Sequence, residues 1–153
     1  MSLLSSVFIG LFLFNISTYA GDDWCIITFV NPPCNSAPGN CTINFDGSLG
    51  GFVAKTAYVE SVMVNGLSRN RSSIGLNVSI CDYAQVTGDA LVAGAARVSG
   101  TAWIFGNARV DGNTQITGNA QVYEDARVNG DTRVGGDSKI SGNDLISNGN
   151  YGF

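Results

Sequence analysis

The chain has 153 residues, 13% of them charged, a formal net charge of −4 and no histidine. This length suits one domain with a small appendage, and 44% hydrophobic residues with a low net charge exclude global disorder. The acidic balance disfavours a nucleic-acid binder, which normally carries a basic footprint. The missing histidine removes the commonest general base and the commonest zinc ligand.

Residues 1–20 have the pattern of a secretory signal peptide. Residues 3–14 are almost entirely apolar, and Thr18-Tyr19-Ala20 places small residues at the −3 and −1 positions before Gly21. The apolar run is short for a membrane span, which needs about 20 residues. Because no Lys or Arg precedes the run, an uncleaved signal anchor stays as the alternative. We expect a secreted, extracellular protein that has no membrane contact after signal cleavage.

Four cysteines follow, and in an exported chain they predict two disulfides. They are Cys25, Cys34, Cys41 and Cys81. Four cysteines allow three pairings, and the sequence does not choose among them. A metal site is the alternative interpretation, but the spacing contains no CxxC pair and no histidine is present. We therefore expect structural disulfides and no bound metal.

The sequence also contains three N-glycosylation sequons, which begin at Asn40, Asn70 and Asn77. Such sequons matter only in a host that glycosylates exported chains, and chance matches are common. We treat the three asparagines as candidate modification sites.

The second half of the chain repeats every six residues. Val or Ile stands at consecutive positions six residues apart, which are Ile74, Ile80, Val86, Val92, Val98, Ile104, Val110, Ile116, Val122, Val128, Val134, Ile140 and Ile146. Two residues before most of them stands a small residue, usually Ala, and two residues after most of them stands Gly. Asn or Asp follows many of these glycines. Internal repetition on this scale is typical of solenoid proteins.

Each hexapeptide has the properties of a very short strand followed by a corner. The small residue and the Val or Ile two positions later point to the same side of a strand. The residue between them is polar or long, as at Gln85 or Arg97, and points away. A period of six excludes an amphipathic helix, and three-residue strands are too short for a hairpin meander. The pattern predicts a coil of short parallel strands, stacked about 4.8 Å apart with Val and Ile on the axis.

Repeats such as Gly-Asn-Ala-Arg-Val at 106–110 and Gly-Asn-Ala-Gln-Val at 118–122 resemble the hexapeptide-repeat family. The resemblance spans about residues 72–148 and implies an all-β, left-handed parallel β-helix with three hexapeptides per coil. Well-known members are acyltransferases with a histidine base, and others are carbonic anhydrases with three histidine zinc ligands. This chain has no histidine to take either role. We therefore expect no enzymatic activity and no cofactor.

Other functions of such a coil match the sequence less well. An acyltransferase would need a carboxylate base, but Asp111, Glu124 and Asp125 fall in or beside corners, where we expect solvated turn residues. Ice binding would need ranked threonines, whereas the threonines occupy inward, outward and corner positions: Thr87, Thr101, Thr114, Thr117 and Thr132. One column of corner residues carries oxygen ligands that could bind calcium: Asp89, Asn107, Asp125 and Asn143. Asp and Asn also tolerate left-handed turns, which explains the column without an ion.

We expect four segments along the chain. They are the signal peptide at 1–20, a Cys-containing cap with irregular strands at 21–71, the hexapeptide-repeat β-helix at 72–148 and a tail at 149–153. Val62 is in phase with the repeat, but Thr56 and Ser68 break it, so residues 52–64 are interpreted as one or two irregular strands or coils. The cap would cover the first coil, because a solenoid end exposes unpaired strand edges.

Grouping equivalent positions of successive coils predicts what each face displays. One face carries Gln85, Thr87, Trp103, Phe105, Gln121, Tyr123, Lys139 and Ser141 on outward positions. The others carry the columns Leu91, Arg109 and Arg127, with Asp111 beside them, and Arg97, Gln115 and Arg133. We expect a contact surface at Trp103, Phe105 and Tyr123 with Gln85 and Gln121, unless a loop or the tail covers it. We interpret the arginines as solvated column residues.

The tail at 149–153 offers no helix or charged strand to close the last coil. An uncovered strand edge can pair with another chain. Head-to-tail contact between identical copies does not form a closed oligomer and therefore gives a filament. We therefore expect a secreted, non-enzymatic structural protein that partners with itself, as a homo-oligomer or filament, through coil ends or the aromatic face. The alternative is a module that binds an extracellular glycan or another partner at the aromatic face.

Overall fold

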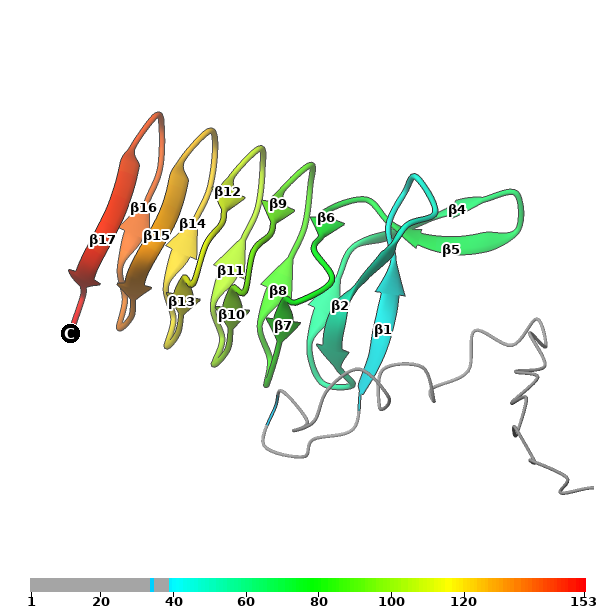
Figure 1. Ribbon diagram of the computed structural model, residues 1–153, viewed down its shortest axis with the longest axis horizontal. Coiled ribbons are helices and arrows are strands. Elements are labelled where there is room, and N and C mark those ends of the chain that lie inside the picture. The colour runs from blue at the N-terminus through cyan, green and yellow to red at the C-terminus, as the bar shows by residue number, and fades with distance from the viewer. Residues whose placement is uncertain (1–33, 35–38) are drawn as a thin grey trace, which may run out of the picture.

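The computed structural model describes Cys34 and residues 39–153 of the chain. These residues form an all-β parallel solenoid of about 4 turns, with roughly 18 residues per turn (Figure 1). Residues 1–33 and 35–38, and with them the expected signal peptide or signal anchor, lie outside the described residues. Among the described residues, no helix has the length and apolar character that a membrane crossing requires.

The rungs lie on three faces of the coil. Face 1 holds β2 (Leu49–Ala54), β7 (Ser79–Ile80), β10 (Arg97–Val98), β13 (Gln115–Ile116) and the second half of β15 (Arg127–Val134). Face 2 holds β3 (Tyr58–Val59), β8 (Gln85–Val86), β11 (Trp103–Ile104), β14 (Gln121–Val122) and β16 (Lys139–Ile140). Face 3 holds β6 (Ser73–Ile74), β9 (Leu91–Val92), β12 (Arg109–Val110) and the first half of β15. The last strand, β17 (Leu145–Tyr151), runs beside β15 from face 3 on to face 1.

Neighbouring rungs pair in parallel with a constant register. Arg97 lies opposite Gln115, and Arg109 lies opposite Arg127. Each residue therefore contacts its equivalent one turn away, so a residue type that recurs with the coil period forms a column along the solenoid. Figure 1 shows these rungs side by side from β6 to β17.

The Val and Ile of the six-residue pattern fill the axis, as the sequence predicts. From Ile74 to Ile140 each of them is at most 3% exposed, and Ile146 packs against them partly buried. The small-residue column beside them is also buried and comprises Ala84, Ala90, Ala96, Ala102, Ala108, Thr114, Ala120, Ala126 and Thr132. Burial of this aliphatic stack is the main force that stabilises the coil.

Glycine is required at the corners because the backbone there is left-handed and tightly stacked. Gly94 has a φ of +66°, and a Cβ on it would lie 2.6 Å from the backbone N and O of Gly112 in the next coil. Glu124, with a φ of 60°, occupies the equivalent place in its own corner. Its carboxylate accepts a hydrogen bond of 2.6 Å from the Gly142 N–H, one coil further on.

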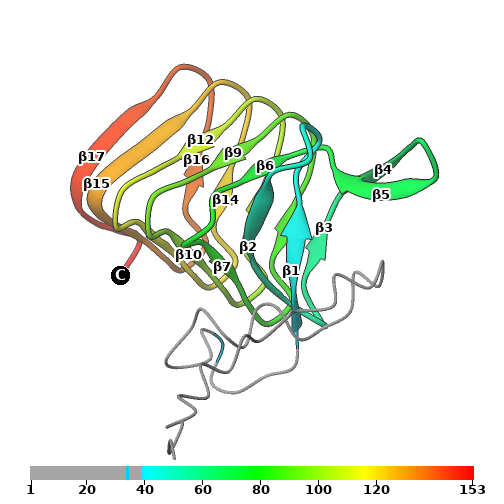
Figure 2. The same ribbon diagram turned by 45° about the vertical axis from the view of Figure 1, so that its right-hand side comes forward.

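The parallel stack begins before residue 72, where the repeat was expected to start. β2 pairs with β7, and β3 pairs with β8, both in parallel. Between the face 2 and face 3 rungs of this first coil, the hairpin of β4 (Ser61–Val64) and β5 (Leu67–Asn70) is inserted, and it projects from the coil in Figure 2. Val62, which is in phase with the repeat, therefore lies in the hairpin, partly buried, rather than on the axis.

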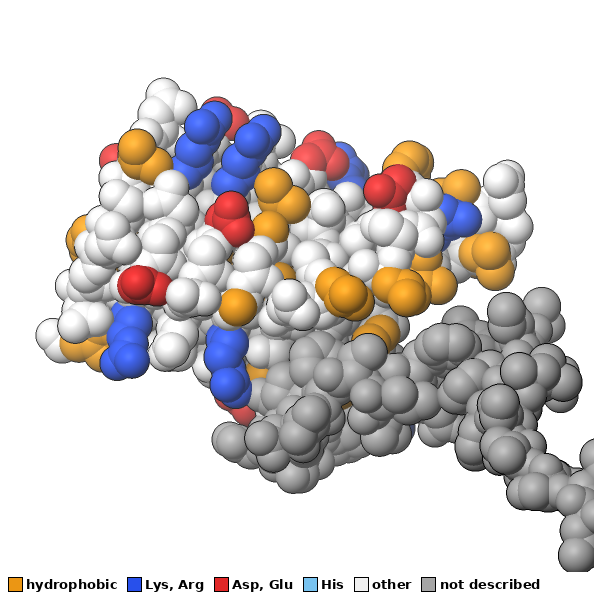
Figure 3. Space-filling view, viewed as in Figure 1, with side chains coloured by type: hydrophobic (Ala, Val, Ile, Leu, Met, Phe, Trp, Pro, Cys, Tyr) orange, Lys and Arg blue, Asp and Glu red, His pale blue; other side chains and the backbone are white. Residues whose placement is uncertain are grey.

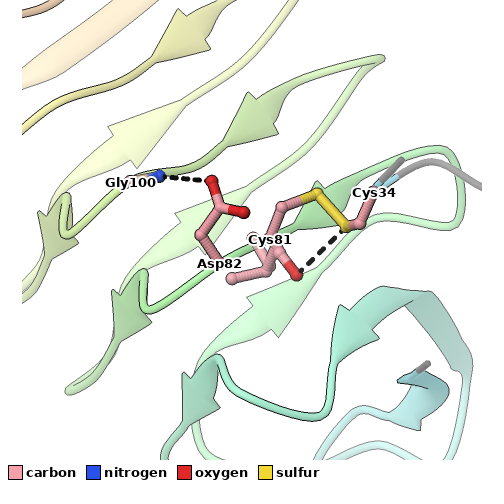
Figure 4. Close-up of a disulfide and its surroundings, with 5 residues drawn as sticks. Cys34, Cys81, Asp82 and Gly100 are labelled. Atoms are coloured by element: carbon pink, nitrogen blue, oxygen red, sulfur yellow. Dashed lines mark hydrogen bonds between the residues drawn. A yellow bond between two sulfur atoms is a disulfide. The ribbon is translucent and has the colours of Figure 1, made fainter. Parts of the chain in front are cut away.

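The N-terminal end carries an additional antiparallel strand and a disulfide. β1 (Gly39–Ile43) pairs antiparallel with β2. Cys34 bonds to Cys81, which lies in the corner after β7, and the two Cα atoms are 5.4 Å apart (Figure 4). Cys41 is disulfide-bonded as well. Cys25 lies outside the described residues.

Candidate binding surfaces

The aromatic residues of face 2 stack on one another. The ring centroids of Trp103 and Phe105 are 4.2 Å apart, and those of Phe105 and Tyr123 are 4.8 Å apart with an interplanar angle of 2°. Both faces of the Phe105 ring are therefore occupied by neighbouring rings. Phe153 from the tail lies against Gly135 on face 1, away from this stack. The three side chains thus cover one another and form an aromatic ladder along the solenoid.

The ladder leaves Trp103 as its most accessible ring. Trp103 is 38% exposed, and its Nε1–H donates a 3.1 Å hydrogen bond to Thr87 Oγ1 of the preceding coil. Phe105 and Tyr123 are half-buried. Gln85 and Gln121 flank Trp103 in the same column, as the sequence predicts. The face therefore offers one exposed indole in a row of amides, rather than three open rings.

A further aromatic residue on face 2 was missed by sequence reasoning. Tyr58 of β3 lies opposite Gln85, two rungs from Trp103 in the same column, and is 53% exposed. The inserted hairpin shifts its position relative to the six-residue pattern. The Asn65-Gly66 pair, a strong hairpin-turn signal, could have revealed that insertion.

Face 3 carries two arginines on adjacent rungs. Arg109 and Arg127 lie opposite each other in the parallel register, and both are exposed. They line a groove of about 460 Å³ whose walls comprise Asp89, Leu91, Asn107, Arg109, Asp125 and Arg127. On face 1, by contrast, Gln115 separates Arg97 from Arg133. Only face 3 therefore places two guanidinium groups one rung apart among the described residues.

The acidic corner residues are engaged by neighbouring donors. Asn107 Nδ2 donates to Asp125 Oδ1 at 3.2 Å, and Arg71 Nε donates to Asp89 Oδ1 at 3.1 Å. The hydrogen bond to Asp89 and its charge, followed by that of Glu60, raise the pKa of Arg71 above its ordinary value. The same amide-to-carboxylate ladder recurs in the other corners, as Asn113 to Asp131 and Asn119 to Asp137.

The corner carboxylates and the threonines form local hydrogen bonds and do not gather into one cluster of polar side chains. Asp111 accepts from the Gly112 N–H at 2.7 Å. Thr114 and Thr132 point inward and donate to backbone carbonyls. Within the described part of the chain, no group of three or more Cys, Asp or Glu residues could hold a metal ion.

The sequons differ in accessibility. Asn40 and Asn77 are exposed. Asn70 is 6% exposed, and its buried Nδ2 has no hydrogen-bond partner. Because a glycan would be attached at that nitrogen, only Asn40 and Asn77 present a free modification site in this fold.

The two ends of the described solenoid differ. At the N-terminal end, the Asn44 side chain bonds both backbone groups of Ile74 on the first rung of face 3. At the C-terminal end, β16 and β17 have no strand on their outer sides among the described residues. Leu145 is 67% exposed there, and Ile146 is only partly buried. Among the described residues β1 and β3 also lack an outer strand at the N-terminal end, so the two ends differ in the Asn44 cap and in the antiparallel direction of β1. We call the end at β16 and β17 the open C-terminal edge.

Comparison with known proteins supports the architecture over a short region. A family model described as "YdcK Beta solenoid repeat" matches residues 120–136. None of the curated proteins and none of the solved structures compared with this chain matches it. The match agrees with the β-solenoid and gives no assignment to the hexapeptide acyltransferases.

Proposed function

We propose that this protein is a secreted, non-enzymatic structural protein that assembles with further copies of itself through the open C-terminal edge. The observation that carries this proposal is the difference between the two ends. At one end Asn44 caps face 3 and β1 pairs antiparallel on face 1, and at the other end β16 and β17 present parallel rungs with no outer strand among the described residues. Edge strands with free N–H and C=O groups are templates for pairing with another chain.

The composition of β17 supports pairing. Its sequence, Leu-Ile-Ser-Asn-Gly-Asn-Tyr, contains no charged residue and no proline. Proteins that avoid edge-to-edge contact usually place Lys or Pro on such strands. The exposed Leu145 side chain adds apolar surface that a partner strand would cover.

The Asn44 cap and the antiparallel β1 at the N-terminal end favour contact between two C-terminal ends. Head-to-tail stacking into a filament, which the sequence suggests, would place the open edge against an antiparallel strand and the Asn44 cap. Contact between two open edges related by a two-fold axis joins identical surfaces and closes as a dimer. The dimer is therefore the assembly that the geometry supports best, with the filament as its alternative.

Sedimentation velocity and negative-stain imaging of the mature protein test this proposal. The wild type should sediment as a dimer, and Leu145→Lys should shift it toward monomers, because the substitution places a charge on an edge strand that has none. The matched control is Leu67→Lys, which adds the same charge on the β5 hairpin at the other end, where Leu67 is 59% exposed. A wild type that stays monomeric at high concentration would overturn self-assembly, and filaments sensitive to both variants would support head-to-tail contact.

The aromatic face is a second candidate site, for an extracellular glycan. The column of face 2 exposes Tyr58 and Trp103, and sugar rings pack against such side chains. Trp103→Ala and Tyr58→Ala should abolish retention on a polysaccharide column while assembly is kept. Tyr83→Ala, at an exposed corner residue, is the control.

We further propose that residues 1–20 are removed on secretion and that the coil is left-handed, as in the hexapeptide repeats it resembles. The Cys34–Cys81 disulfide supports an oxidising compartment. The protein recovered from the medium should have the mass of a chain that begins at Gly21. An experimental electron-density map would show the handedness of the coil. Recovery of the uncleaved chain in a membrane fraction would favour the signal anchor.

A further inference from the structure

Neither arginine of the face 3 pair forms an ion pair with another described residue. The nearest ion pairs on this face are those of Arg71, with Glu60 and Asp89. Arg109 and Arg127 are exposed like charges on adjacent strands, whose backbones are about 4.8 Å apart. Figure 3 shows Lys and Arg side chains side by side over the upper ends of β12 and β15, where these residues begin the strands.

The carboxylates of the same groove accept hydrogen bonds from other donors rather than from the pair. Asp89 is bonded by Arg71 at 3.1 Å, and Asp125 is bonded by the Asn107 amide at 3.2 Å. Asp111, which lies two residues beyond Arg109, accepts from its neighbouring backbone N–H. An oxyanion placed between the two guanidinium groups would relieve their repulsion and accept hydrogen bonds from both.

The other groove residues suit the remainder of a sugar. Leu91 precedes Arg109 in the column and gives an apolar surface. Asp89, Asn107 and Asp125 form the opposite wall, and their oxygens can accept hydrogen bonds from hydroxyl groups. The groove runs along three rungs, a span of about 10 Å that suits a short oligosaccharide.

We propose that this groove binds an acidic oligosaccharide, with Arg109 and Arg127 holding its carboxylate or sulfate group and the corner column holding its hydroxyls. This site is separate from the aromatic ladder, which lies on face 2. It lies one rung inside the open edge, because Arg127 lies opposite Leu145 of β17.

Titration calorimetry on the purified full chain tests the site with three probes. The probes are an oligogalacturonate, a sulfated oligosaccharide and the neutral maltohexaose. The acidic probes should bind and the neutral one should not, and raising the salt concentration should weaken binding because the pair is exposed. Binding of only one acidic probe supports the site and identifies the anion as carboxylate or as sulfate ester.

A charge-matched pair of variants separates the groove from general electrostatics. Arg109→Gln/Arg127→Gln should raise the Kd at least about tenfold, which corresponds to about 1.4 kcal/mol. Arg133→Gln/Lys139→Gln removes the same charge from faces 1 and 2 and should change the Kd less than about twofold. We expect both variants to fold because all four side chains are exposed, and circular dichroism checks this. Equal losses in the two variants, or no binding of either acidic probe by the wild type, would overturn the proposal.

Discussion

Asn44 closes the first rung of face 3 by bonding both backbone groups of Ile74. The Ile74 N–H donates to Asn44 Oδ1 at 2.8 Å, and Asn44 Nδ2 donates to the Ile74 carbonyl at 3.0 Å. A side-chain amide thus stands where the next rung would be. This substitution of a side chain for a strand explains how the coil can begin without an exposed edge at this face.

Asn44→Ala should therefore destabilise the protein. The change leaves a buried N–H and a buried C=O without partners, and one such loss costs about 1–3 kcal/mol. Urea denaturation measures the effect as a lower midpoint. Asn143→Ala, at an exposed corner asparagine, is the control and should change the midpoint little. Equal midpoints for the two variants would show that Asn44 does not cap the rung.

Alanine substitutions at a hairpin-turn glycine and at a corner glycine should separate backbone strain from steric conflict. Gly66 and Gly94 both have a positive φ, of +80° and +66°. An added Cβ meets nothing within 4 Å at Gly66 but lies 2.6 Å from the backbone of Gly112 at Gly94. Gly66→Ala should cost only the strain of the left-handed conformation, about 1–2 kcal/mol. Gly94→Ala should lower the melting temperature clearly further, and equal shifts would contradict the tight stacking of the corners.

The aromatic ladder should contribute to stability. Phe105→Ala removes both stacked pairs, each worth about 0.5–1.5 kcal/mol. The variant should lose stability in urea and also lose near-ultraviolet circular dichroism from Trp103, whose ring would lose its neighbour. Tyr83→Ala removes an exposed ring of 66% accessibility and should do neither. An unchanged Trp103 signal in Phe105→Ala would argue against the ladder.

Asp46 should titrate below its ordinary range. Its carboxylate accepts hydrogen bonds from Ser48 Oγ at 2.7 Å and Ser48 N at 2.9 Å, and the hydroxyl is the main cause of the lowered pKa. Because the folded pKa lies below the unfolded one, the stabilisation is present above the unfolded pKa and is lost as the pH falls through the folded pKa. Ser48→Ala should raise the Asp46 pKa in an NMR titration, and an unchanged value would contradict the assignment.

The rungs could be predicted from the sequence because every hexapeptide imposes the same physical demand. Each places a small residue and a Val or Ile on the axis, and the structure buries both. The first coil could not be predicted in this way. Val59 and Ile74 stand on successive faces but are 15 residues apart (74 minus 59) rather than six, because the β4–β5 hairpin lies between them.

The candidate surfaces were predictable in position but not in orientation. The repeat assigns Trp103, Phe105 and Tyr123 to one face, and the structure places them there. Whether the rings face outward or stack on one another depends on side-chain torsions, which a period of six does not determine. The groove on face 3 likewise needs the register that sets Arg109 opposite Arg127.

The parallel register of the coil is the claim on which every surface depends. NMR of uniformly labelled protein tests it through nuclear Overhauser contacts between backbone protons of neighbouring rungs. The structure predicts contacts between Arg97 and Gln115, between Trp103 and Gln121, and between Arg109 and Arg127. Contacts in an antiparallel pattern, or between residues with any other constant separation, would contradict the solenoid and remove both the ladder and the groove.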